Sequence, residues 1–126
     1  MKRPPWLMIG ILTLAAAARL YSLNARPLWY DEAFAILYAE KSLSSILSGT
    51  LTPVQGAAAD VHPVAFYFLL HGWMTLVGQT PLAVRLLSVM YGLGTVALVY
   101  RLMRDLFSGP VARWSALVAA VAPFQI

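Results

Sequence analysis

The chain has no cysteine and few charged side chains. Its 126 residues include five Asp and Glu and nine Lys and Arg, and charged residues make up 11% of the total, against about 25% in soluble domains. Without cysteine, neither a disulfide nor a thiolate metal site can form. Hydrophobic residues make up 60% and the mean hydropathy is +0.72. The composition therefore predicts an integral membrane protein.

The net charge of +4 does not indicate nucleic-acid binding, because the basic residues form no stripe with interleaved aromatic rings. Several of them lie instead at the ends of apolar runs, namely Lys2, Arg3, Arg101, Arg104 and Arg113. The positive-inside rule places such residues in the cytoplasm. We therefore expect a cytoplasmic N-terminus in a multi-pass protein of the cell (inner) membrane.

Three apolar runs predict transmembrane helices at about 5–23, 82–104 and 111–126. The first run is long enough to cross the bilayer if the Arg19 side chain extends toward the outer headgroups. A cleaved signal peptide is the competing interpretation of the first run. The run at 64–77 is too short to span, and if it crossed, the later arginines would lie outside. The chain as a whole, residues 1–126, is thus predicted to be an all-α polytopic membrane protein whose first outer loop covers about residues 24–81.

Two helices are expected in that outer loop. Apolar residues at Ile36, Ala39, Leu43, Ile46 and Leu47 form one helical face, which predicts an amphipathic helix over 33–47 that ends near Gly49. This helix is too short and too polar to span, so we expect it in the membrane interface. The second interfacial helix is the apolar run at 64–77, between Pro63 and Gly78.

Two of the five acidic residues are adjacent, in Trp29-Tyr30-Asp31-Glu32. Aromatic rings favour the headgroup level, so this motif indicates a site at the membrane surface. Asp31 could cap the following helix, with Glu32 near its positive dipole end. It could also be a base that takes a proton from an acceptor hydroxyl. The two interpretations do not exclude each other.

Other residues can also be interpreted from the sequence, some of them in more than one way. Asp60 and His62 precede Pro63 in a polar turn, or they supply part of a divalent-metal or phosphate site. Arg85 could pair with the acidic loop, meet a phosphate, or be a flanking residue of its span. His71 is expected to be a hydrogen-bonded interior histidine. Gly92, like Gly94 nearby, is expected to permit close helix packing.

The order of these motifs resembles the N-terminal part of the GT-C superfamily of membrane glycosyltransferases. The bacterial branch that is similar to dolichyl-phosphate-mannose protein mannosyltransferases, lipid A aminoarabinose transferase and rhizobial galacturonosyltransferases is the best match. The resemblance extends over essentially the whole chain, and the segments that carry it are 26–33, 60–67, 84–88, 101–107 and 122–126.

The resemblance implies transfer of a sugar from a polyprenyl-phosphate carrier to a glycan, lipid or protein acceptor at the outer face of the membrane. It implies that Asp31 is the essential acidic residue, and that Asp60 and His62 help to form the donor region and hold a divalent metal ion. We assign Tyr30, Glu32 and Arg85 to substrate binding.

Members of that superfamily have many more spans than this chain. We therefore expect the chain to be an N-terminal segment that is inactive alone. The alternative from another class is a small non-enzymatic membrane subunit or assembly factor, which would account for the short length directly.

Overall fold

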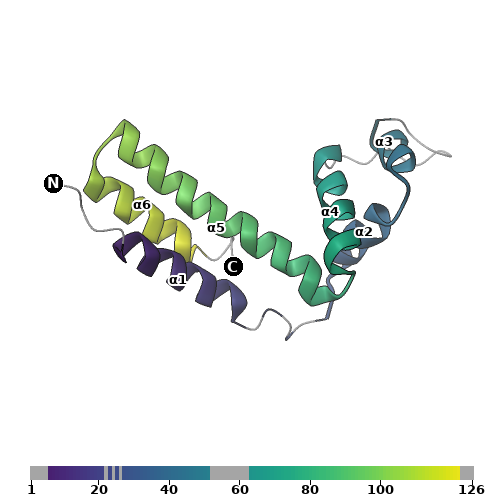
Figure 1. The fold of residues 1–126 in the computed structure, drawn as a ribbon, viewed down its shortest axis with the longest axis horizontal. Coiled ribbons are helices and arrows are strands. Elements are labelled where there is room, and N and C mark those ends of the chain that lie inside the picture. The colour runs from purple at the N-terminus through teal and green to yellow at the C-terminus, as the bar shows by residue number, and fades with distance from the viewer. Residues whose placement is uncertain (1–5, 22, 24, 26, 52–62, 123–126) are drawn as a thin grey trace. The chain divides into compact units, whose positions relative to one another are not determined.

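The computed structural model describes residues 6–21, 23, 25, 27–51 and 63–122, and all regular structure in these residues is helical. The helices are α1 (Trp6–Leu20), α2 (Tyr30–Ala39), α3 (Leu43–Leu51), α4 (Val64–Val77), α5 (Pro81–Leu106) and α6 (Gly109–Val121). The chain divides into two compact units (Figure 1), one of Met1–Ala25 with Ser88–Ile126 and one of Arg26–Leu87. The prediction of an all-α fold is confirmed.

The first unit joins α1, α6 and the part of α5 that follows residue 87. In Figure 1 the purple α1 and the yellow α6 lie side by side and run in the same direction, antiparallel to α5. Fully buried alanines line their contact: Ala15, Ala116 and Ala120. Ile11 and Val96 complete this core. Small side chains let helix backbones approach closely, which is the usual way that apolar helices associate in lipid.

In the second unit, α2 and α3 both pack against α4. The core between them consists of Ile36, Tyr38, Ala39, Ile46, Tyr67, Leu70 and Met74. His71 is half-buried and its Nδ1 lies 2.7 Å from the carbonyl oxygen of Ala39, so the prediction of a hydrogen-bonded interior histidine is confirmed. This bond connects α4 to the end of α2.

Tyr38 is the central side chain of this core. Its ring centroid lies 4.5 Å from that of Tyr67, and its hydroxyl donates to the carbonyl oxygen of Ile46 at 3.3 Å. The hydroxyl also lies so close to Gly49 that a Cβ atom at position 49 would collide with it. Gly49 therefore allows α3 to approach α2. We had expected Gly49 to end the helix, but α3 continues to Leu51.

The expectation of one helix over 33–47 is wrong. α2 ends at Ala39 and α3 begins at Leu43, with Ser42 between them. The Ser42 hydroxyl accepts a hydrogen bond from the backbone N–H of Ser45 at 3.3 Å, which is the contact that a serine N-cap makes with the third residue of a helix. This cap starts a new helix although the apolar spacing continues through the break.

The helix α4 has the predicted bounds. It begins after Pro63, whose fixed φ suits the residue before a helix. It ends before the C-cap Gly78, whose φ of 100° is unfavourable for other residues. α5 begins with Pro81 in its first position, and the Thr80 hydroxyl accepts from the backbone N–H of Ala83 at 3.2 Å. Proline is well suited to that position.

Among the described helices, only α5, with 26 residues, is long and apolar enough to cross a membrane. α1 has 15 residues and α6 has 13, fewer than the ~20 that a bilayer requires. The prediction of three spans, at about 5–23, 82–104 and 111–126, therefore stays a prediction for the first and the third. The membrane side of the predicted outer loop, 24–81, also stays a prediction.

A cysteine-labelling experiment tests the predicted topology, because the natural sequence has no cysteine. In intact cells a Ser48→Cys variant, in α3, should react with an impermeant maleimide. A Ser108→Cys variant, between α5 and α6, should be protected because the adjacent arginines favour the cytoplasm. Both variants should react after permeabilisation, and labelling of Ser108→Cys alone in intact cells would show the opposite orientation.

Candidate functional site

The acidic motif lies at the beginning of α2. Trp29 is the N-cap, with φ −73° and ψ 158°, and Asp31 and Glu32 are in the first turn. Glu32 is the third helical residue, and its Oε2 accepts a hydrogen bond from the backbone N–H of Trp29 at 2.9 Å. This is the glutamate half of a capping box. Asp31 does not occupy the N-cap position, so the capping interpretation applies to Glu32 instead.

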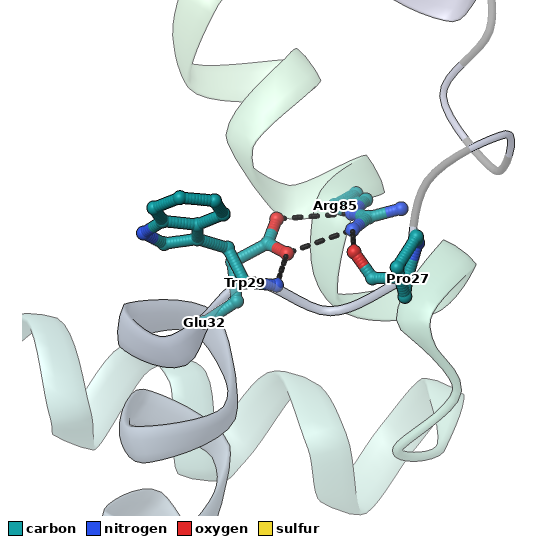
Figure 2. A network of polar contacts seen from close by, with 4 residues as sticks. All are labelled: Pro27, Trp29, Glu32 and Arg85. Carbon is teal, nitrogen blue, oxygen red and sulfur yellow. Dashed lines mark hydrogen bonds and ion pairs between the residues drawn. The ribbon is translucent and has the colours of Figure 1, made fainter.

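Glu32 also forms a bidentate ion pair with Arg85, which lies one turn into α5. Figure 2 shows the carboxylate facing the guanidinium, with Nε donating to Oε1 at 2.9 Å and Nη2 donating to Oε2 at 2.7 Å. Nη2 also donates to the carbonyl oxygen of Pro27 at 3.1 Å. The Arg85 side chain is 11% exposed and that of Glu32 is 34% exposed. Two parallel charged hydrogen bonds fix the orientation of both groups.

The ion pair changes the acidity of Glu32. The hydrogen bond from Arg85 lowers the pKa of Glu32 below its ordinary value of 4.5; the Trp29 amide and the charge of Arg85 act in the same direction, and partial burial opposes them. A carboxylate with a lowered pKa that is occupied by three donors is a weak base. The arrangement therefore favours a role for Glu32 in holding the site together.

Asp31 differs from Glu32 in its surroundings. It is exposed, and within the described part of the chain its side chain forms no hydrogen bond or ion pair. Trp29 and Tyr30 beside it are 73% and 79% exposed. The first turn of α2 thus presents one accessible carboxylate next to two aromatic rings, while the neighbouring carboxylate is held by Arg85.

The residues assigned from the sequence are brought together only in part. The structure places Tyr30, Asp31 and Glu32 on one helical turn and joins Glu32 to Arg85. The pairing with the acidic loop, one of the alternatives for Arg85, is therefore present. Asp60 and His62 lie outside the described residues, so the metal hypothesis stays a prediction. No group of three or more His, Asp or Glu side chains that could hold a metal ion occurs in the segments that the structure does describe.

Two backbone groups complete the site and were not anticipated. They are the N–H of Trp29 and the carbonyl of Pro27. A signal for the first was present, because Glu32 stands three residues after Trp29, the spacing of a capping box. It was missed because Ser or Thr normally fills the N-cap of that motif. No feature of the sequence indicates the carbonyl contact.

A comparison with protein families identifies a matching family. The family model described as dolichyl-phosphate-mannose-protein mannosyltransferase matches residues 61–126, just over half of the chain, including Arg85 but not Asp31 and Glu32. No curated protein and no solved structure was found to match the chain.

The matched family is a family of glycosyltransferases that are integral membrane proteins. Since the match covers more than half of the sequence, the chain belongs to the dolichyl-phosphate-mannose-protein mannosyltransferase family. The resemblance noted in the sequence is thereby confirmed at the level of the family.

The lowered pKa of Glu32 predicts a pH dependence of stability. The folded protein holds this carboxylate ionised more strongly than the unfolded chain does, so its contribution is present above pH 4.5 and is lost as the pH falls below that value. Glu32→Gln should keep the capping interaction, since Gln also serves at this position, but lose the ion pair. The melting temperature of the wild type should therefore exceed that of the variant at pH 7, and the difference should shrink toward zero as the pH falls below 4.5.

The control is Glu40→Gln, which changes an exposed glutamate at the other end of α2. Glu40 forms no ion pair within the described segments, so this variant should follow the wild-type profile. If Glu32→Gln and Glu40→Gln have the same profile in thermal scans of detergent-solubilised protein, the ion pair contributes nothing to stability.

Proposed function

We propose that the chain is part of an enzyme that transfers a sugar from a polyprenyl-phosphate donor to a hydroxyl of a glycan, lipid or protein acceptor at the outer face of the membrane. Membership of the mannosyltransferase family supports this class of reaction. The resemblance to the bacterial branch of the GT-C superfamily supports the donor and the membrane side. Mannose is the first sugar to test because it gives the family its name.

Asp31 is proposed as the base. The observation that carries this assignment is the contrast between two adjacent carboxylates, since Asp31 is exposed while Glu32 is held by Arg85. A general base must be able to reach the proton that it removes. Asp31 meets this requirement, and Glu32 would first have to give up its three hydrogen bonds.

In the proposed reaction the acceptor oxygen attacks the anomeric carbon of the sugar. A bond forms between this oxygen and the carbon as the bond from the carbon to the phosphate oxygen breaks. The acceptor proton goes to Asp31, and the lipid phosphate leaves with the bonding electron pair. Positive groups near that phosphate would stabilise the charge that develops on it, and Arg85 is the nearby cation assigned to substrate binding.

The other residues assigned from the sequence have supporting roles in this proposal. Tyr30 is exposed next to Asp31 and offers an aromatic ring and a hydroxyl to the substrate. Glu32, which we had assigned to substrate binding, is proposed to act on Arg85, whose guanidinium it orients. Asp60 and His62 remain candidate ligands for a divalent cation.

The test is Asp31→Asn in the complete protein, measured as transfer from polyprenyl-phosphate mannose to an acceptor. Asn has the shape of Asp but cannot take up the proton, so we expect the rate of transfer to fall by ~10²-fold or more. The position of Asp31 in the first turn means that Asn loses only a weak favourable interaction with the helix dipole. Expression and thermal stability should therefore remain close to wild type.

Glu40→Gln is the matched control and should retain full activity, because Glu40 lies at the opposite end of α2. If Asp31→Asn transfers the sugar at a rate near that of the wild type, Asp31 is not the base. If no variant and no wild-type preparation transfers from any polyprenyl-phosphate sugar, the proposed reaction itself fails.

A further inference from the structure

Arg19 is a charged residue near the end of the apolar helix α1, and it is buried. Its exposed fraction is 4%, whereas we had expected it to extend toward the headgroups. Nη1 donates to the carbonyl oxygens of Ala15 at 3.1 Å and Ala120 at 3.0 Å, and Nη2 donates to that of Ala119 at 3.3 Å. Two of these three acceptors belong to the last turn of α6.

The carbonyls at the end of a helix are suitable acceptors for a guanidinium. The last four have no N–H partner within their own helix, and they carry the negative end of the helix dipole. A guanidinium has several N–H groups in one plane and can bond two neighbouring carbonyls. In apolar surroundings both the charge and the carbonyls are costly to leave without partners. The contact therefore provides hydrogen-bond partners both for the guanidinium carried by α1 and for the carbonyls at the end of α6.

A glycine on α5 provides space for the same guanidinium. A Cβ atom built on Gly92 would lie 2.5 Å from Nε and 3.1 Å from Cδ of Arg19. Real Cβ atoms essentially never show the first distance, and the second is tighter than most. Gly94, two residues further along the same helix, has nothing within 4 Å of the equivalent position. The two glycines thus have different surroundings, and only the first faces Arg19.

We propose that Arg19 is an internal link that holds α1 and α6 together, and that Gly92 on α5 must be small so that the guanidinium fits. The link requires the C-terminal ends of α1 and α6 to lie side by side, so it favours the parallel pairing of these helices. The buried alanines, Ala15 and Ala120 among them, allow the two helices to approach closely, but they do not by themselves fix how the helices are aligned along their axes. Arg19 is thereby assigned to the fold and not to a lipid headgroup.

The experiment compares Gly92→Ala with Gly94→Ala in the full chain, purified in detergent, by thermal unfolding. Alanine is the better helix former, so Gly94→Ala should leave the melting temperature unchanged or raise it. Gly92→Ala should lower the melting temperature by about 3 °C or more, because the guanidinium must leave its position. Equal effects of the two substitutions would overturn the proposal.

The same two substitutions in an Arg19→Met background complete a double-mutant cycle. With the guanidinium removed, Gly92→Ala should behave like Gly94→Ala, and Arg19→Met should itself lower the melting temperature. A loss at Gly92→Ala that persists without Arg19, or an Arg19→Met protein as stable as the wild type, would show that no such link exists. Should Arg19→Met fail to fold, the two glycine variants of the otherwise wild-type chain decide alone.

Discussion

The bidentate ion pair between Glu32 and Arg85 organises the candidate site. It connects the first turn of α2 to the beginning of α5, within one compact unit. The same carboxylate also caps α2 through the Trp29 amide. One side chain therefore fixes where α2 begins and how it meets α5, and the exposure of Asp31 follows from the same geometry. Because the pair is partly shielded from water, it is screened less by salt than a fully exposed pair would be.

Helix boundaries could be predicted where a residue with a special backbone preference fixes them. Pro63 and Gly78 bracket α4, and the predicted range of 64–77 is the observed one. The helix over 33–47 was predicted wrongly because its apolar spacing continues across the break at Ser42. A capping hydroxyl there competes with continuation of the helix. Periodicity reports which face is buried, and it does not report where the backbone leaves the helical conformation.

The candidate site, like the helix boundaries, could be predicted only in part. The acidic motif was recognisable because carboxylates are rare in this sequence, and pairing of Arg85 with the acidic loop was among the alternatives considered. Which of the two adjacent carboxylates takes part in that pair could not be read from the sequence. The answer depends on helical geometry, since consecutive residues on a helix point in different directions. Arg19 could not be placed from the sequence for another reason. Two of its three acceptors are backbone carbonyls about 100 residues away, and backbone groups leave no signature in a sequence.

The close approach of the Tyr38 hydroxyl to Gly49 has a consequence for how this sequence can evolve. A side chain can be added at position 49 only if the hydroxyl at position 38 is removed or moved away. The hydroxyl in turn bonds the Ile46 carbonyl of the same helix that carries Gly49. Among relatives, the residues at positions 38 and 49 should therefore covary, with tyrosine found beside glycine and larger residues at 49 found beside phenylalanine or smaller side chains at 38.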